Sequence, residues 1–559
     1  IVFVQTCAAE KRRRRKRGLM EDPARRVMIN PAVCEGCGDC SVQSNCISVE
    51  PLETELGRKR AINQSSCNKD YSCVKGFCPS FVNVDGGKPR KRAAMDVTAL
   101  MGDLPEPASR PTLEKPYNIA VGGVGGTGVL TIGALLGMAA HIEGKASMIL
   151  DMSGLAQKGG AVLSHVRLSQ NTDDVKTSRI VTGSADLLIA ADEVMAISKE
   201  TISLCDSGRT HGVVNTHLIP IADFIHNRDF DFQNRKVDSV LQGALTRDSA
   251  FMDFTKVAEG LLGDAIATNM MMMGYAYQQG RLPLSAESLL QAIEINGVSI
   301  KMNTQAFQLG RLAAADPGRL AQMIKGKDET AVPKSLDAMS LDEIVAHRSK
   351  LLTDYQNAKL ASAYRKVVDQ VKALAKQHGF GEELPRAVAI NYAKLLAYKD
   401  EYEVARLYTD GRFQKMLREQ FEGDYKISFN LAPPILSSEL DTQGRPLKRE
   451  FSARILPLFR LLAKMKGLRG TPFDIFGYNK DRKMERELIA GYERDIETVL
   501  RLVSPANIDI AVELLSLPDR IRGYGPVKEK AVKDAKARYE QLAKNLVNPP
   551  PVTRQIAAE

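Results

Sequence analysis

The chain has 559 residues, of which 44% are hydrophobic and 26% charged, an ordinary globular composition with the length of roughly three to four domains. It contains no tryptophan and only 6% aromatic residues, so it lacks the stacking platforms that single-stranded nucleic-acid binding requires. The net charge is +10, but the run from Lys11 to Arg17 supplies seven of these charges and leaves three for the rest of the chain. We interpret this run as a solvated basic linker, with a nuclear-import or nucleic-acid patch as the alternative.

The N-terminal segment, residues 1–27, resembles the end of a preceding domain. It opens with Ile1 to Val4 and no initiator methionine, and this apolar start resembles the last strand of a preceding domain. No small-residue cleavage site is present, so we do not interpret it as a signal peptide. We expect residues 1–27 to be the end of a missing upstream domain followed by the basic linker, in a cytoplasmic protein.

Residues 28–90 form a cysteine-dense, turn-rich module. Seven of the nine cysteines lie between Cys34 and Cys78, and the first three have the spacing C-x2-C-x2-C. Such gaps let a short loop, here with Gly36 and Gly38, bring several thiolates to an iron–sulfur cluster. Structural zinc prefers pairs of C-x2-C units, and a disulfide framework requires an even count and an oxidising compartment. The spacing therefore predicts a ferredoxin-like 4Fe–4S module.

The fourth ligand of this cluster is less regular. Bacterial ferredoxins have C-x2-C-x2-C-x3-C-P motifs and exchange the fourth cysteine between two motifs. Here Cys46 follows Cys40 after five residues without a proline, whereas Cys78 precedes Pro79. The crosswise rule assigns Cys34, Cys37, Cys40 and Cys78 to one cluster. It leaves Cys46, Cys67 and Cys73 for an incomplete or differently ligated second cluster, or for none.

Two cysteines, Cys7 and Cys205, lie outside the module and are expected to be ordinary thiols. A cluster of this kind transfers single electrons and performs no bond chemistry on an organic substrate by itself. It therefore implies a cofactor site upstream and an electron carrier downstream.

A proline-containing linker, residues 91–116, precedes an α/β domain over residues 117–315. The segment 118–140 lacks charged residues over a membrane-like length, but seven of its residues are glycine, which favours a strand, a tight turn and a helix. We expect strands at 117–121, 147–150, 161–168, 186–190 and 212–215 and a helix at 129–141, an α/β Rossmann-like domain with a mostly parallel sheet.

The tight turn of this domain contains Gly123, Gly125, Gly126 and Gly128, which satisfy G-x-G-x-x-G, and Asp151 follows 23 residues beyond the last glycine. This pattern is a dinucleotide fingerprint, and it leaves open an NAD(P)-linked dehydrogenase with an attached iron–sulfur cluster. Glycines at a helix N-terminus also allow a phosphate to approach the backbone.

The C-terminal region, residues 330–559, is predicted to be mainly α-helical. Ser340 and Glu343 form a capping box. Apolar residues between Tyr364 and Ala375 share one helix face before Gly379 ends the helix.

Several segments resemble one known family. The stretch from Asp151 through Gln157, Lys158 and Gly160 into Ser164–Arg167 resembles the gamma-type domain of the 2-oxoacid:ferredoxin oxidoreductases. Segments 183–192 and 303–311 are similar to later parts of that domain. The order of cysteine module, gamma-type domain and helical extension, the last including 421–425 and 473–476, resembles the C-terminal half of the long, fused indolepyruvate ferredoxin oxidoreductases.

The resemblance implies an enzyme that oxidatively decarboxylates aryl pyruvates such as indolepyruvate on thiamine diphosphate, releases an acyl-CoA and passes electrons through 4Fe–4S to ferredoxin. No G-D-G motif with a following magnesium-binding Asn is present, so thiamine diphosphate and Mg would lie in the missing upstream part and the chain alone would not complete the reaction. The expected partners are ferredoxin, the aryl pyruvate, CoA, the upstream thiamine-binding domain and further copies in a homo-oligomer, without nucleic acid or membrane.

The resemblance also implies cofactor-binding residues but no catalytic residue. The four glycines Gly123, Gly125, Gly126 and Gly128 would border the CoA or thiamine site, with Gln157, Lys158 and Arg167 nearby as anion-binding or positioning groups. The alternatives are a packing turn and solvated charges. A non-catalytic electron-transfer scaffold remains as a third interpretation of the whole chain.

Overall fold

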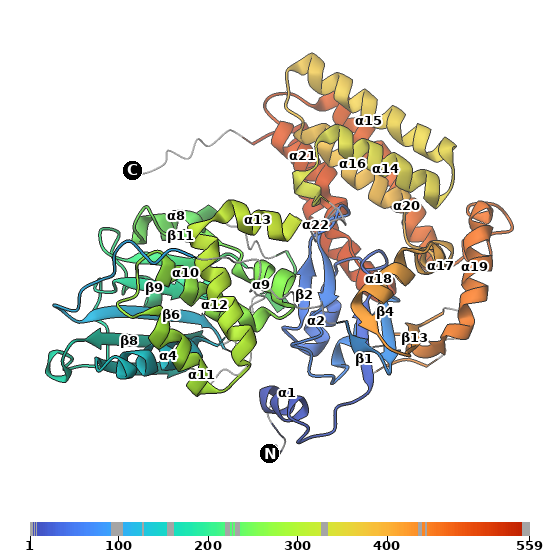
Figure 1. Cartoon of the computed structure of the whole chain (residues 1–559). Helices are drawn as coiled ribbons and strands as arrows, with labels where there is room; N and C mark the ends of the chain where they lie inside the picture. The colour runs from blue at the N-terminus through green and yellow to red at the C-terminus, as the bar shows by residue number, and fades with distance from the viewer. Residues whose placement is uncertain are drawn as a thin grey trace. The chain divides into compact units, whose positions relative to one another are not determined.

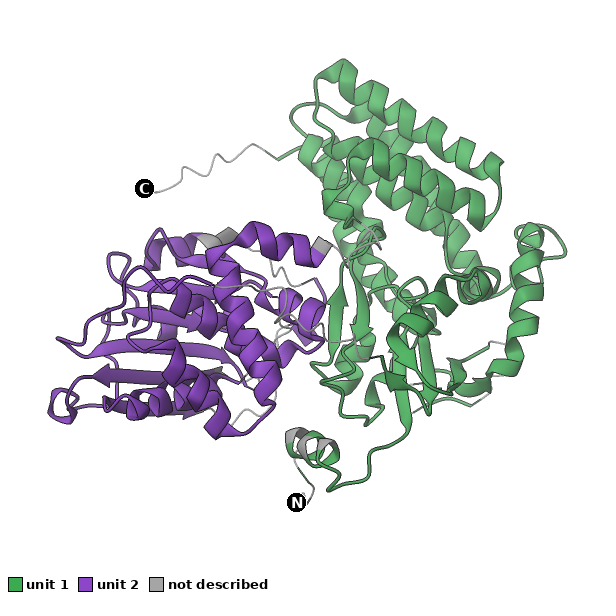
Figure 2. Cartoon of the chain, viewed as in Figure 1, with its two compact units in different colours: residues 1–90, 333–559 green, residues 91–332 purple. Residues whose placement is uncertain are grey.

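The computed structural model describes residues 4, 6, 8–90, 104–125, 128–153, 161–217, 224–225, 227–229, 235–325, 334–433, 439–441 and 444–550. The chain divides into two compact units (Figure 2). Unit 1 consists of residues 1–90 together with 333–559, and unit 2 consists of residues 91–332.

Unit 2 contains a six-stranded sheet in the order β11-β10-β9-β6-β8-β7 (Figure 1). The first four strands in this order are mutually parallel, whereas β8 runs antiparallel to both β6 and β7. The sheet is therefore mixed but mostly parallel. The five predicted strands are confirmed, and β11 is a sixth strand that the sequence did not predict. Their bounds are β6 (Tyr117–Val124), β7 (Ala146–Ser153), β8 (Ala161–Ser169), β9 (Leu187–Ala190), β10 (His211–Asn215) and β11 (Ala250–Met252).

The helices of unit 2 cover the sheet with apolar residues. The predicted helix after the glycine turn is α4 (Val129–Ile142), whose small residues let it pack closely on β7 and β8. Its partners in the main core include α10 (Thr268–Gln278), which is buried on nearly all sides, and α12 (Ile300–Ala315). The others are α5 (Glu193–Ala196), α6 (Lys199–Ile202), α8 (Arg235–Ala244), α9 (Phe254–Leu262), α11 (Ala286–Asn296) and α13 (Pro317–Lys325).

The described half of the expected linker lies on this unit. Arg311 in α12 donates hydrogen bonds to the Pro105 carbonyl and to Glu106, each at 3.0 Å. Residues 104–116 are thus attached to unit 2 rather than extended away from it.

Unit 1 begins with α1 (Ala8–Lys16), so most of the basic run that we interpreted as a linker is helical. The cysteine module follows with β1 (Arg25–Ile29), α2 (Asp39–Ser44), β2 (Val49–Leu52), β3 (Lys59–Ile62), the 3-10 helix η1 (Ser72–Lys75), β4 (Phe81–Asp85) and β5 (Lys88–Pro89). Strand β4 lies between β1 and β13 (Lys426–Leu431), and β14 (Arg449–Ser452) completes the sheet. The C-terminal region therefore supplies half of the strands in the sheet of the module.

The C-terminal region is mainly helical, as predicted, apart from β12 (Phe421–Glu422), β13 and β14. The capping box of Ser340 and Glu343 is present at the start of α14 (Leu341–Tyr355), and α15 (Ala358–His378) ends at Gly379. These helices share one core with α16 (Glu383–Leu396), α20 (Lys480–Leu502), α21 (Ile508–Ser516) and α22 (Gly525–Val547).

A second core joins the module to α17 (Glu401–Thr409), α18 (Arg412–Gln420) and α19 (Leu456–Lys464). Phe429 of β13 is fully buried there, with its ring 4.9 Å from that of Tyr408 and 5.4 Å from that of Phe459. Among the helices in the described ranges, none has the length and apolar character needed to cross a bilayer.

Candidate functional site

Four thiols gather around the first cysteine loop. Cys34 and Cys37 lie between β1 and α2, Cys40 lies in the first turn of α2, and Cys78 follows η1. Burial raises the pKa of Cys37 to about 12, with contributions from the negative charges that Cys78 and Cys34 would carry. Burial and the neighbouring Cys37, Cys78 and Cys34 raise the pKa of Cys40 well above its usual range. The structure thus brings together the four cysteines that the crosswise rule assigns to one cluster.

The other three thiols form a second group. Burial raises the pKa of Cys73 to about 12, and the nearby Cys67 and Cys46 add to this effect. Burial also raises the pKa of Cys67, and Cys46 contributes in the same direction. Cys205 lies apart in unit 2, where its thiol donates to the Thr201 carbonyl at 3.4 Å.

The backbone of the first loop is shaped by glycine. Gly36 has a φ of 67°, and a Cβ there would overlap the Arg58 carbonyl oxygen. Its N–H donates to the Cys34 sulfur at 3.3 Å, the type of contact that stabilises a cluster-bound thiolate. A Cβ at Gly76 would lie 2.8 Å from Cys40 Cα. Glycine at both positions therefore lets η1 and the loop approach each other.

The donor set fits an iron–sulfur cluster in its chemistry. In the described part of the chain the cysteines are free of disulfides. No three or more His, Cys, Asp or Glu side chains of that part converge as ligands of one metal ion. A 4Fe–4S cube has its four ligands on four separate irons, so its thiols stand farther apart than those of a single ion. The seven ligands predicted from the sequence are all sulfur donors, and Cys34, Cys40, Cys46 and Cys73 are buried.

Positive side chains surround the first group of thiols. Arg60 is 1% exposed and interacts electrostatically with Cys40, Cys34 and Cys37. Lys448 interacts in the same way with Cys78 and Cys40, and its Nζ donates to the Gly76 carbonyl at 2.5 Å. Buried cations offset the charge of thiolates or of an anionic cluster, because opposite charges attract strongly away from water.

A cavity of about 620 Å³ opens beside Cys78. Phe77, Cys78 and Pro79 line one part of it, and Lys399, Phe459 and Tyr524 are among the lining residues from the C-terminal region. Lys399 forms a mostly buried ion pair with Glu35 at 2.6 Å. Sequence reasoning missed this cavity because its walls come from segments more than 300 residues apart.

In unit 2 the glycine turn is held by two buried polar residues. Gly123 lies one residue before the end of β6, where it pairs with Val162 of β8. Gly125 follows in the turn, and Gly128, with a φ of 84°, is the N-cap of α4. A Cβ at Gly128 would overlap the amide of Asn269, which is 4% exposed. Asp192 accepts from the Val124 N–H at 2.8 Å and is fully buried. Gly126 lies outside the described residues.

Sequence reasoning did not single out Asp192 or its neighbour Asn215. Asn215 ends β10 and donates to the Ala191 carbonyl and to Thr255 Oγ1, each at 2.9 Å. Burial raises the pKa of Asp192 despite three backbone hydrogen bonds that act against it. The sequence did contain one indication of these two residues, because both are polar and follow or end a predicted parallel strand. The carboxyl ends of parallel strands are where α/β sheets bind ligands.

The other predicted cofactor residues are not gathered at this turn. Arg167 pairs opposite Asn118, at the far end of β6, and donates to the Asn118 Oδ1 at 2.9 Å and to the Thr177 carbonyl at 2.8 Å. Gln157 and Lys158 lie outside the described residues.

The position of Asp151 differs from that in a dinucleotide-binding domain. There, the strand with the acidic residue lies beside the first strand. Here β8 separates β7 from β6, and the Asp151 carboxylate accepts from Ser164 Oγ at 2.6 Å. This order of strands disfavours the interpretation as an NAD(P)-linked dehydrogenase.

Known protein families match parts of both units. The family model "Pyruvate ferredoxin/flavodoxin oxidoreductase" matches residues 118–313, and a family of unknown function, DUF6537, matches residues 341–541. Unit 2 therefore contains the gamma-type domain of the 2-oxoacid:ferredoxin oxidoreductases.

Two curated relatives are more specific. Subunit IorB of the indolepyruvate oxidoreductase of Thermococcus kodakarensis is 30% identical over 213 residues, which cover 36% of this chain and 98% of the subunit. That of Pyrococcus horikoshii is 29% identical over 206 residues, with the same coverage. The chain belongs to the family of indolepyruvate oxidoreductase subunit IorB. Among solved structures, the gamma subunit of a keto/oxoacid ferredoxin oxidoreductase from Geobacter sulfurreducens has 21% identity and a TM-score of 0.26, over 35% of this chain and 98% of that subunit.

Proposed function

We propose that the chain is the electron-transferring part of a cytoplasmic enzyme that oxidatively decarboxylates aryl pyruvates, indolepyruvate among them, to acyl-CoA and reduces ferredoxin. One observation carries the proposal: a chain with an IorB-family domain also gathers four shielded thiols without disulfides. Such an arrangement of thiols is typical of a group that accepts single electrons.

Cys34, Cys37, Cys40 and Cys78 would hold a ferredoxin-like 4Fe–4S cluster, which when bound takes up and releases one electron at a time. The Gly36 N–H would stabilise the Cys34 thiolate through its hydrogen bond. Arg60 and Lys448 would favour the reduced, more negative state, because they place positive charge beside the ligands.

In unit 2 the glycine turn supplies a place for an anionic group. Among the described residues, no side-chain hydrogen bond caps the N-terminus of α4, and backbone N–H groups at a glycine-rich helix N-terminus would favour a phosphate. We assign the border of the CoA or thiamine diphosphate site to Gly123, Gly125, Gly126 and Gly128, with Gln157 and Lys158 as positioning groups. The hydrogen bonds of Arg167 to Asn118 and Thr177 favour a structural role for that side chain.

The overall reaction conserves atoms and electrons without a further oxidant. The 2-oxoacid loses its carboxylate as CO2, its acyl group becomes the thioester of CoA, and two ferredoxins accept one electron each while a proton is released. Another part of the enzyme would supply the site for thiamine diphosphate and magnesium. The chain itself would assemble with further copies into a homo-oligomer.

The test combines the full chain with the thiamine-binding polypeptide that accompanies it. Under anaerobic conditions, ferredoxin reduction is followed spectrophotometrically with CoA and indolepyruvate, phenylpyruvate or pyruvate. We expect activity with the aryl pyruvates, a loss of at least tenfold in Cys37→Ala, and wild-type activity in Cys205→Ala, the matched control.

Three results would contradict the proposal. If ferredoxin is reduced with none of the three acids, the proposed activity is refuted. If Cys37→Ala reduces ferredoxin as fast as the wild type, the proposed role of the cluster is refuted. Direct reduction of the bound iron by NADH or NADPH would instead support the dehydrogenase.

A further inference from the structure

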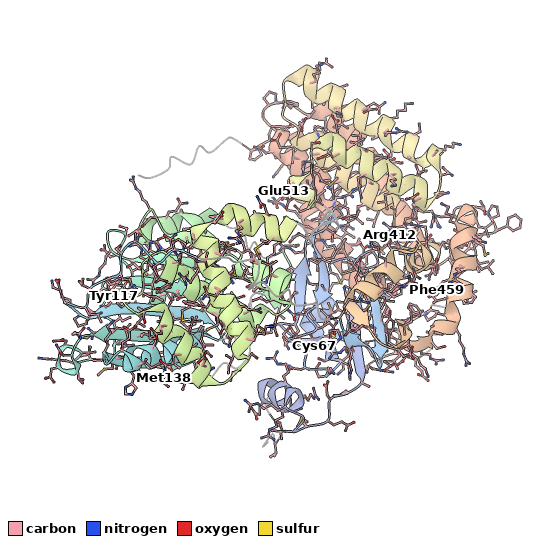
Figure 3. The ribbon with its side chains drawn as sticks, in the orientation of Figure 1. Cys67, Tyr117, Met138, Arg412, Phe459 and Glu513 are labelled. Carbon is pink, nitrogen blue, oxygen red and sulfur yellow. The ribbon has the colours of Figure 1, made fainter. Side chains whose placement is uncertain are left out.

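The second cysteine loop repeats the first, with one ligand position changed. In the first loop the spacing is Cys34-x2-Cys37-x2-Cys40. From Cys67 to Cys73 the gaps are the same, but the middle position is Asp70 (Cys67 is labelled in Figure 3). The inference drawn from this repeat rests on the proposed role of the chain in electron transfer.

The two loops have the same backbone turns. In the first, the residues two and four places after the leading cysteine are Gly36 and Gly38, with φ of 67° and 78°. In the second, the same two places have φ of 52° and 59°, although the residues are Lys69 and Tyr71. Side chains other than glycine rarely adopt this left-handed conformation, and where they do the surroundings enforce it. The second loop is therefore built to the shape of the first.

The hydrogen bonds of the two loops also correspond. The N–H of Gly36 donates to the Cys34 sulfur at 3.3 Å, and the N–H of Lys69 donates to the Cys67 sulfur at 3.4 Å. In the first loop, the Cys37 sulfur also accepts from the backbone N–H of Asp39, two residues later. The Asp70 Oδ1 accepts from the Ser72 N–H at 3.1 Å in the same way. The carboxylate of Asp70 thus occupies the place that the thiol of Cys37 has in the first loop.

Contacts from other segments fix the second loop. In α1, Arg12 donates to the Ser66 carbonyl and Arg15 to the Asn68 carbonyl, each at 2.6 Å. Lys69 Nζ donates to Asp22 and to the Pro23 carbonyl, each at 2.7 Å. The basic run of the sequence therefore holds this loop in place, which accounts for charges that the proposed reaction does not use.

We infer that Cys46, Cys67 and Cys73 hold a second 4Fe–4S cluster whose fourth ligand is the carboxylate of Asp70. Asp70 interacts electrostatically with both Cys67 and Cys73, and these two interact with Cys46. A carboxylate is a harder and weaker ligand for cluster iron than a thiolate. Because Asp70 is also exposed, the iron at this corner would be the one that leaves first on oxidation.

The experiment uses the full chain, reconstituted anaerobically with iron and sulfide. Iron and acid-labile sulfide are counted, and EPR and Mössbauer spectra are recorded before and after mild oxidation. We expect about eight irons per chain, with one lost on oxidation to leave a 3Fe–4S signal. Asp70→Cys should retain all of its iron, whereas Asp70→Asn should show the 3Fe–4S signal before oxidation.

Two controls separate ligation from folding. Asn at position 70 can still accept from the Ser72 N–H, so Asp70→Asn preserves the turn. In unit 2, the Asp206 Oδ1 accepts from the Gly208 N–H at 2.9 Å in a turn of the same kind, and Asp206→Asn should leave the iron unchanged.

The inference is overturned if the wild type binds only about four irons and Cys46→Ala binds the same number. It is also overturned if Asp70→Cys and the wild type give the same 3Fe–4S signal after oxidation. A failure of the proposed function differs from both, since ferredoxin would then not be reduced with any of the three acids while the iron count and the EPR signals stayed as expected for two clusters.

Discussion

Gly36 shows how one residue shapes the first cysteine loop. Its left-handed φ is difficult for other residues, and the Arg58 carbonyl oxygen fills the space where a side chain would begin. The same glycine presents its N–H to the Cys34 sulfur. Gly57, with a φ of 79°, is left-handed too, but the nearest atom to its Cβ position is Leu336 Cδ2 at 3.9 Å. The two glycines therefore separate the effect of conformation from that of crowding.

We expect Gly36→Ala to lower the free energy of unfolding of unit 1 by about 2–4 kcal/mol and to reduce bound iron, because both the backbone and the Arg58 carbonyl must move. Gly57→Ala should cost about 1–2 kcal/mol, from the conformation alone, and retain iron. Urea unfolding followed by circular dichroism, with an iron assay, measures both. Equal losses in the two variants would show that crowding at Gly36 has no effect.

At the scale of elements, the sequence predicts structure where the determining residues are near one another. Five of the six strands in the sheet of unit 2, the capping box at Ser340 and the helix stop at Gly379 depend on local patterns and were predicted, whereas the short strand β11 was not. Strands β12 to β14 were not, because short strands at 421–452 become recognisable only once β4 and β5 lie beside them.

The candidate site divides in the same way. The C-x2-C-x2-C spacing is a local signal, so the first loop could be recognised from sequence. Asp192 and Asn269 contact the glycine turn from distant segments, so no local sequence motif predicts them. The match of the second loop to the first was hidden because the corresponding ligand position is not a cysteine.

Glu143 connects two helices of unit 2, at the end of α4 and the start of α11. It accepts from the Ser285 N–H and from Ser288 Oγ, each at 2.6 Å, and from Lys145 Nζ at 2.5 Å. Burial alone would raise the pKa of Glu143, but the hydrogen bonds from Lys145, Ser288 and Ser285 outweigh it and lower the pKa to about 2. A carboxyl group whose pKa is lowered on folding stabilises the folded state above its unfolded pKa.

This contribution is complete above about pH 4.5 and is lost as the pH falls toward 2. We expect Glu143→Gln to destabilise unit 2 by roughly 2–3 kcal/mol at neutral pH and by much less near pH 3. Urea unfolding of the iron-free chain at the two pH values tests this, with the exposed Glu287→Gln as control. A difference between wild type and Glu143→Gln that does not vary with pH would contradict the assignment.

At the scale of the whole molecule, unit 2 is an insertion within unit 1. Residues 1–90 and 333–559 form one compact unit, and residues 91–332 form the other between them in sequence. Ligands that bind one folded unit stabilise that unit by mass action. The cysteines of the module are all in unit 1.

We therefore expect removal of iron by a chelator to destabilise unit 1 and leave unit 2 unchanged. Hydrogen exchange resolved by peptide distinguishes the units, because β6 and β9 report on unit 2 while β4 and β13 report on unit 1. Faster exchange in β4 and β13 alone is the expected result. Faster exchange in both pairs of strands to the same extent would show that the units unfold together.

During synthesis of the chain, β4 must wait for its partner strand β13. About 340 residues separate the two strands, and at 5–20 residues per second a ribosome takes roughly 20–70 s to make them. For that interval the edge of β4 lacks its partner and is open to pairing with other strands. Slower translation of residues 91–425 would lengthen this exposure, so the yield of folded chain depends on translation speed within a segment that contains none of the seven clustered cysteines.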